Sequence, residues 1–378
     1  MPGRRPLVRR SLTAAALTGA AAASVRALVR PRPGAEHRLI DWEAARRIAR
    51  ARSGERVRLR ADKARRLASL YQGYAAEMLP HMAEAFGAVP AELVPVAVLD
   101  RHAFIDANLE IARRLLDPVE RLRASAGETN LSALGRRLTS RYMGELFGLM
   151  SQRALGQFDP VLMLPEATPT VRPASSLFLV EPNIELFERE QGVPAEPLRR
   201  WLILHEATHA WQFEAHPWLA AHIGELMHGL VVASLAEPAG GTDRRSVNLE
   251  TLRSLSTTVT GQLRSIGRVQ AIMSVLEGYS NFVMHRVGRT HIPEFDRLES
   301  AFRRRQGQRS LIERLVLAVT GIAVKLRQYQ VGEAFCDAAE SAGGIALLNR
   351  VWEGPQTMPT MAELRTPSRW ISRVQPSG

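Results

Sequence analysis

The chain has 378 residues, of which 46% are hydrophobic and 23% charged, a composition typical of a soluble globular protein with a sizeable core. Its single cysteine, Cys336, excludes a disulfide framework and thiolate-rich metal sites. After the N-terminal segment no apolar run reaches the length of a membrane span, which excludes a multi-span membrane protein. The net charge of +12 is concentrated in residues 1–35, which hold seven arginines and no acidic residue. The remainder is only mildly basic, so the sequence predicts no nucleic-acid partner.

Residues 1–36 form a basic leader rich in arginine and alanine, which we expect to be disordered or signal-like. Arg9 and Arg10 precede a weakly apolar stretch, Ser11–Ser24, in the order found in a twin-arginine export signal. Against export, alanine is a weak hydrophobe and Arg26 follows at once. The sequence therefore favours a cytoplasmic protein whose residues 1–35 make weak contact with anionic lipid, and it leaves export open.

Beyond the leader, the pattern predicts a mainly α protein with minor β structure. Apolar residues spaced three and four apart indicate helices over residues 39–122, interrupted by Pro90, Pro95 and a short strand at Val94–Leu99. A break rich in small polar residues follows near residue 130. We therefore expect an N-terminal helical subdomain over residues 37–130 and a second, larger region over residues 131–378.

The second region is also expected to be mostly helical. The helical pattern resumes at Ala133–Leu155, and three prolines indicate a loop at Pro165–Pro173. The apolar run Ser176–Val180 predicts a strand that could pair with an extended peptide. Further on we expect helices at Pro197–Phe213, Thr251–Val287 and Ser310–Ala342, with a loop at Glu237–Asp243.

The most informative motif is HExxH, formed by His205, Glu206 and His209 within a helical pattern. Residues four apart lie on one face of a helix, so the two imidazoles can bind one zinc ion. Glu206 follows His205 directly and can take a proton from a zinc-bound water, whose pKa the ion lowers. The alternative is a partly exposed helix whose histidines hydrogen-bond to water. The apolar flanking residues favour metal ligation, because buried ionisable groups need partners.

A catalytic zinc ion needs a third protein ligand, and the HExxH helix does not supply one. In the extended motif HExxHxxGxxH, a glycine and a third histidine follow. Here Gln212 and Ala215 occupy those two positions, and His216 lies one residue out of register. The third ligand is therefore expected from elsewhere in the chain.

Glu277 is the strongest candidate for this third ligand. It lies in an otherwise apolar helical run, where a lone carboxylate needs a charged partner. Gly278 allows another helix to approach closely, and Asn281 lies one turn on, where it could bond the second nitrogen of a ligand histidine. An ion pair between Glu277 and an arginine is the alternative, and Glu225 and His285 remain as other possible ligands.

Hydrolysis through a tetrahedral intermediate also needs a donor for the developing oxyanion. Tyr329 is the predicted donor, and Tyr279 competes with it. The chain contains no GxSxG, no GxxxxGK[ST] and no GxGxxG motif, which disfavours an α/β-hydrolase, a P-loop NTPase and a Rossmann enzyme.

The segment His205–Leu219, HEATHAWQFEAHPWL, resembles an actinobacterial-type family of zincin-like proteins. Its members are described as hydrolases, as zinc-dependent metalloproteases, or as proteins associated with deazaflavin-cofactor biosynthesis. The resemblance extends over roughly residues 39 to 375 and includes the stretches Ile40–Trp42, Val98–Arg101 with Asn108, Leu155–Pro160, Leu179–Asn183, Leu276–Gly278 and Lys325–Tyr329.

The resemblance implies a mainly helical, zincin-like metallohydrolase, with residues 131–378 as its catalytic region. It implies His205 and His209 as metal ligands, Glu206 as general base and Glu277 as the third ligand. In the wider pattern an aspartate often follows that glutamate by four residues, and this chain has Asn281 there.

The residues and the resemblance together predict a zinc-dependent metallohydrolase, with a peptidase as the first hypothesis. Its cofactor would be Zn²⁺ and its partner a peptide or amide substrate. A zinc-stabilised helical scaffold or binding protein without catalysis is the alternative; in it, Glu206 would be dispensable.

Overall fold

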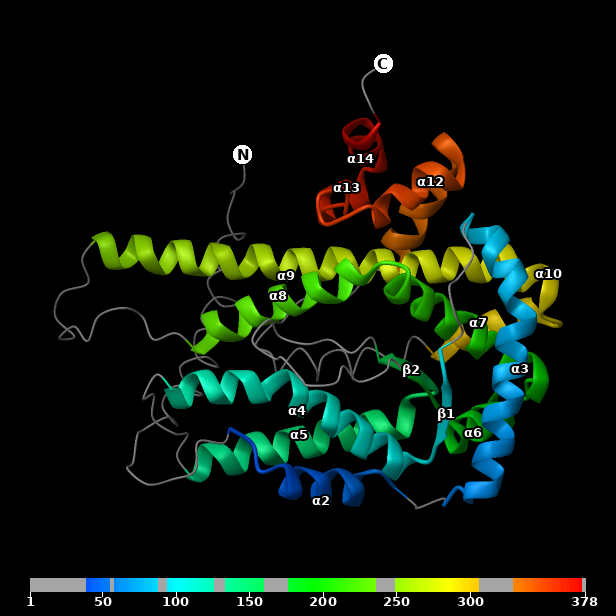
Figure 1. Cartoon of the computed structure of the whole chain (residues 1–378), viewed down its shortest axis with the longest axis horizontal. Coiled ribbons are helices and arrows are strands. Elements are labelled where there is room, and N and C mark those ends of the chain that lie inside the picture. The colour runs from blue at the N-terminus through cyan, green and yellow to red at the C-terminus, as the bar shows by residue number, and fades with distance from the viewer. Residues whose placement is uncertain are drawn as a thin grey trace, which may run out of the picture. The chain divides into compact units, whose positions relative to one another are not determined.

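The computed structural model describes residues 39–54, 58–87, 94–125, 133–159, 176–235, 249–305 and 329–375. Over these residues the chain is mostly helical and contains one three-stranded sheet, which confirms the mainly α fold class (Figure 1). The leader at residues 1–36 and the loops expected at Pro165–Pro173 and Glu237–Asp243 lie outside the described part of the chain. Among the described helices, none is both long and apolar enough to cross a membrane.

The chain forms two compact units, each assembled from separate stretches of sequence. The first draws on residues 1–55, 105–152 and 308–324, and the second contains the rest. In the first unit, the N-terminus of α2 (Trp42–Arg52) is capped by Asp41, whose side chain accepts a hydrogen bond from the Ala44 N–H. The small core of this unit lies between α2, the larger part of α4 (Arg101–Ser125) and α5 (Ala133–Arg153).

The sheet belongs to the second unit. Its strands are β1 (Val96–Leu99), β2 (Gly156–Asp159) and β3 (Ser176–Val180), in the order β1-β3-β2. β3 pairs in parallel with β1 and antiparallel with β2, so both of its edges are occupied. The hypothesis that Ser176–Val180 could pair with an extended peptide is therefore wrong, since a central strand has no free edge.

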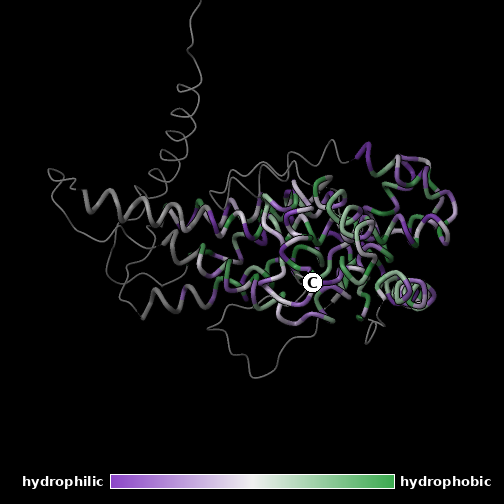
Figure 2. Tube along the Cα trace, turned by 90° about the horizontal axis from the view of Figure 1, so that it is seen from above, coloured by the Kyte–Doolittle hydropathy of each residue, from purple (hydrophilic) through white to green (hydrophobic). Residues whose placement is uncertain are grey.

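Helices make up the rest of the second unit. In chain order they are α3 (Ala61–Phe86), α6 (Glu181–Gln191), α7 (Ala195–Glu214), α8 (Pro217–Leu235), α9 (Leu249–Val283), the π-helix η1 (Met284–Gly288), α10 (Arg289–His291), a helix over residues 295–305, α12 (Tyr329–Leu348), the 3₁₀-helix η2 (Asn349–Trp352), α13 (Met361–Arg365) and α14 (Pro367–Val374). Hydrophobic and hydrophilic residues are interspersed along these helices, as expected for helices that bury one face (Figure 2).

The helices α7 and α9 form the centre of the second unit. α7 buries residues on most of its circumference, among them Leu198, Ile203 and Leu204. α9 packs closely against α12 at Gly278. A β-carbon added there would lie only 2.2 Å from the backbone carbonyl carbon of Gly332. The prediction that Gly278 permits a close helix approach is thus confirmed.

Candidate metal centre

The HExxH motif lies on α7, as predicted. His205 and His209 are one turn apart, their ring centroids are 4.8 Å apart, and the ring planes are nearly perpendicular. Their Nε2 atoms are 3.3 Å from one another. Both rings are half-buried, so these nitrogens face each other in a partly desolvated environment.

Glu277 reaches the same point from α9. Its Oε2 is 3.9 Å from His205 Nε2, and one ligand atom from each of the three residues lies within 4.8 Å of the others. Among the described residues no arginine forms an ion pair with Glu277, which removes the support for that alternative. The other possible ligands lie elsewhere: Glu225 is exposed beside His222, and His285 is bonded to two glutamates.

The three groups match what a zinc ion requires. Zinc binds imidazole nitrogen and carboxylate oxygen at about 2.0–2.2 Å, so two ligand atoms in a tetrahedral site are roughly 3.3–3.6 Å apart. The separation of 3.3 Å between the two imidazole nitrogens falls in this range, the carboxylate oxygen is 3.9 Å from His205 Nε2, and all three ligand atoms lie within 4.8 Å of one another. Two histidines and a glutamate are also a ligand set of catalytic zinc sites, with one position left for water or substrate.

Gln212 determines which nitrogen of His209 carries the proton. The Gln212 amide nitrogen donates to the Leu276 carbonyl at 3.0 Å, so its Oε1 is the atom that faces His209 Nδ1, at 2.9 Å. An acceptor at this position requires a proton on Nδ1, which leaves the Nε2 lone pair directed at Glu277 and His205. Ser280 Oγ also lies 3.3 Å from the same Nδ1.

Sequence reasoning missed Gln212 in this role, although a signal was present. Gln212 follows His209 by three residues, a spacing that brings two side chains together on a helix. No hydrogen bond joins His209 to Asn281, the residue predicted for this role, which is half-buried one turn beyond Glu277. The contact between Asn281 and a ligand histidine therefore stays a prediction.

Glu206 is buried against the sheet. A β-carbon built on Gly156, the first residue of β2, would lie 2.6 Å from Glu206 Oε1. The carboxylate thus occupies the space that a side chain at position 156 would fill. This contact was not predicted, because nothing in the local sequence relates a glycine at position 156 to a carboxylate 50 residues later.

Of the two candidate oxyanion donors, Tyr279 has a described side chain and Tyr329 does not. Tyr329 is the first residue of α12, but its side chain lies outside the described part of the structure. Tyr279 is fully buried, its hydroxyl donates to Asn349 Oδ1 at 2.8 Å, and burial raises its pKa. Tyr279 therefore belongs to the aromatic core.

His216, the histidine one residue out of register in the motif, is also part of the aromatic core. Its ring stacks on Trp352 with a centroid distance of 5.4 Å and meets Trp211 edge-on. Burial lowers the pKa of His216 to about 4. It is not among the residues whose ligand atoms converge with those of His205.

An HExxH helix joined at one point by a glutamate from a second helix is the arrangement of a zincin-like metallohydrolase. The chain belongs to the zincin-like metallopeptidase family, whose model matches residues 40–371. It is also similar to a protein from Chloroflexus aurantiacus whose crystal structure is described as a novel fold and as that of a candidate hydrolase. That structure is 33% identical in sequence and superposes with a TM-score of 0.67 over 90% of this chain and 100% of its own. Among curated proteins, none matches the sequence.

Proposed function

We propose that this metallohydrolase uses zinc to hydrolyse a peptide or related amide bond, with Glu206 as the general base. The observation that carries the proposal is the convergence of His205, His209 and Glu277, whose ligand atoms all lie within 4.8 Å of one another. Membership of the zincin-like metallopeptidase family supports the same chemistry.

Zinc held by these residues would polarise the substrate carbonyl and lower the pKa of a water molecule to about 7. The chain supplies the geometry for this. Gln212 keeps the Nε2 lone pair of His209 free, and its bond to the Leu276 carbonyl fixes α7 beside the residue that precedes Glu277.

Glu206 would move the proton. It lies beside His205 on α7 and is buried, so its carboxylate can take a proton from the attacking water and return it to the leaving amine. Its carboxylate lies in the space that a side chain at position 156 would fill. We assign the oxyanion donor to Tyr329, as an extension of the same proposal.

Two variants and a metal analysis test the proposal. We expect about one zinc ion per wild-type chain, and loss of that ion in His205→Ala. Glu206→Gln should keep the zinc and lose turnover of a peptide library by at least about a hundredfold. Equal zinc in wild type and His205→Ala would refute the metal site, and unchanged turnover in Glu206→Gln would refute the base.

The experiment also separates an enzyme from a scaffold. A scaffold would bind zinc, lose thermal stability when a chelator removes it, and cleave no peptide in the wild type. In that case Glu206→Gln would match the wild type in every measurement, and the catalytic proposal would be wrong.

A further inference from the structure

The second unit contains a pocket of about 650 Å³ that is separate from the metal centre. It lies between α8, α9 and the segment that leads into α13, and it has the size of pockets that hold small organic ligands. Arg264, Arg268 and Ile272 line it from α9 at intervals of four residues. Glu277 lies roughly 140° around the helix from Ile272, so the metal centre and the pocket use different faces of α9.

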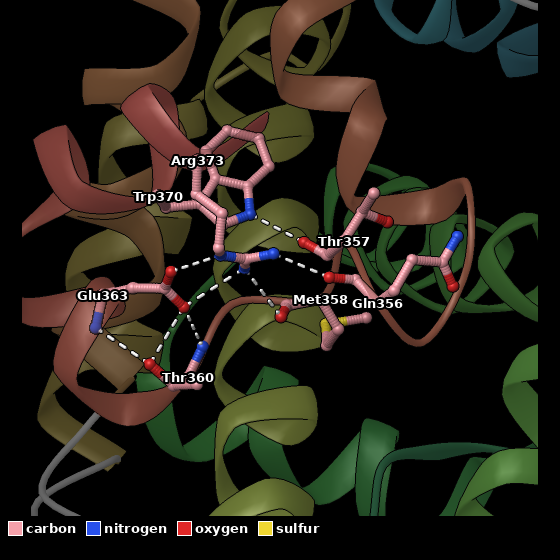
Figure 3. Close-up of polar contacts among 7 residues, drawn as sticks. All are labelled: Gln356, Thr357, Met358, Thr360, Glu363, Trp370 and Arg373. Atoms are coloured by element: carbon pink, nitrogen blue, oxygen red, sulfur yellow. Dashed lines mark hydrogen bonds and ion pairs between the residues drawn. The ribbon is translucent and has the colours of Figure 1, made fainter. Parts of the chain in front are cut away.

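One wall of the pocket is fixed by hydrogen bonds (Figure 3). Arg373 is bonded to Glu363 and to the carbonyl oxygens of Gln356 and Met358. Trp370 Nε1 donates to the Thr357 carbonyl at 2.7 Å. The charge of Arg373 is therefore compensated, and the segment 356–360 that it holds is an ordered wall.

The α9 side of the pocket carries two positive charges that no described acidic residue compensates. Arg264 and Arg268 are exposed and lie one helical turn apart, and neither forms an ion pair within the described residues. Like charges at this spacing repel each other and weaken the helix. An anion between the two guanidinium groups would remove this repulsion and accept charge-assisted hydrogen bonds from both.

The remaining lining is largely apolar. Met358 and Pro359 lie in the ordered wall, Met361 is the first residue of α13, and Ile272 lies one helical turn after Arg268 on α9. Methionine side chains adapt to irregular apolar ligands. An inorganic anion would leave this apolar surface uncovered, whereas an uncharged apolar molecule would leave the arginines unpaired.

We propose that this pocket binds a small amphiphilic anion, with its carboxylate or phosphate between Arg264 and Arg268 and its apolar body against Met358 and Met361. The proposal does not depend on zinc or on hydrolysis. It commits to a free small molecule as the occupant, with decanoate as the probe.

Gly267 provides a test that leaves every charge in place. It lines the pocket, and a β-carbon added there meets no atom within 4 Å, so we expect the side chain in Gly267→Met to occupy part of the pocket. Gly261→Met is the matched control, because Gly261 lies on the same helix, also has open space around it, and does not line the pocket. Methionine has a higher helix propensity than glycine, so neither substitution should lower the melting temperature.

The charge is tested separately. Arg264→Gln with Arg268→Gln removes the two positive charges that α9 brings to the pocket, and Arg65→Gln with Arg66→Gln removes two from the exposed face of α3. Isothermal titration of the full-length protein with decanoate should show one saturable site in wild type. We expect affinity to fall by about tenfold or more in the pocket double variant and in Gly267→Met, and to stay unchanged in both controls.

Several results would overturn the proposal. They are the absence of saturable decanoate binding in wild type, wild-type affinity in the pocket variants, or a loss of affinity in the control variants equal to that in the pocket variants. Decanol or inorganic phosphate binding as tightly as decanoate would show that only one half of the ligand is recognised, against the proposal. Binding to phosphatidylglycerol vesicles without binding of decanoate would assign the surface to a membrane and would likewise contradict it.

Discussion

The Glu206 carboxylate packs directly on Gly156: a β-carbon at position 156 would come within 2.6 Å of Glu206 Oε1. The contact joins the HExxH helix to the first residue of β2. Glu206 can therefore occupy this position only because residue 156 has no side chain.

We therefore expect Gly156→Ala to displace Glu206 while the metal ligands stay in place. Peptide hydrolysis should fall by about tenfold to a hundredfold, because small displacements of a catalytic group are costly, and zinc content should stay at the wild-type level. Gly229→Ala on α8 is the control, since a β-carbon there meets nothing within 4 Å. Hydrolysis at the wild-type rate in Gly156→Ala would show that the contact does not position the base.

Gln212 has two functions that substitutions can separate. Gln212→Glu keeps an acceptor for His209 Nδ1 but cannot donate to the Leu276 carbonyl, whereas Gln212→Ala loses both contacts. Zinc affinity, measured by competition with a chelator, should fall about 10- to 100-fold in Gln212→Ala and less in Gln212→Glu. The same affinity in all three proteins would mean that Gln212 does not orient His209.

The contact of α9 with α12 leaves no space at Gly278. We expect Gly278→Ala to lower the free energy of unfolding by about 1–3 kcal/mol or more, because a β-carbon would overlap the Gly332 backbone. Gly73→Ala on α3 should instead stabilise the protein by about 0.5–1 kcal/mol, since that position is open. Urea denaturation of both variants measures the difference.

His285 joins three elements through two carboxylates. Its Nδ1 lies 3.0 Å from Glu333 and its Nε2 2.6 Å from Glu299, and these hydrogen bonds, that to Glu333 first, raise the pKa of His285. The raised pKa stabilises the fold fully below pH 6.5, and the stabilisation is lost as the pH rises through the raised value.

His285→Gln should accordingly cost about 1–2 kcal/mol of unfolding free energy at pH 6, a value reduced for partial exposure, and less at pH 9. His222→Gln serves as the control, because His222 is 3.8 Å from an exposed glutamate. A pH-independent difference between wild type and His285→Gln would contradict the prediction.

His216 has the opposite dependence on pH. Burial holds the pKa of His216 at about 4, below its ordinary value of 6.5, so the unfolded chain binds the proton more readily. The fold should lose about 1–2 kcal/mol, after allowance for solvent screening, as the pH falls from 6.5 to 4. In His216→Phe, which keeps the aromatic stacking, the melting temperature should depend less on pH over that range. An unchanged dependence would contradict this.

The sequence was most informative where local patterns determine structure. The strand Ser176–Val180 and the helix predicted at Pro197–Phe213 correspond to β3 and α7, because a short apolar run and helical periodicity are local signals. Glu277 could be predicted as a candidate because a carboxylate in an apolar helix needs a partner wherever that partner lies.

Features that depend on distant contacts were not predictable in this way. β2 contains only Gly156–Asp159 and is a strand because it pairs with β3. The place of β3 at the centre of the sheet follows from two partners, one on each side, that no local pattern reveals. The contact of Gly156 with Glu206 likewise exists only once α7 lies on the sheet.

The bond from Gln212 to the Leu276 carbonyl closes a loop of 64 residues with protein atoms alone. The three ligand groups are consequently gathered by the fold itself, in contrast to a zinc finger, where the ion must assemble the chain around it. We therefore expect the protein to stay folded when a bound ion is removed. Stripping with a chelator and reloading with Zn²⁺ or Co²⁺ should therefore be a reversible cycle.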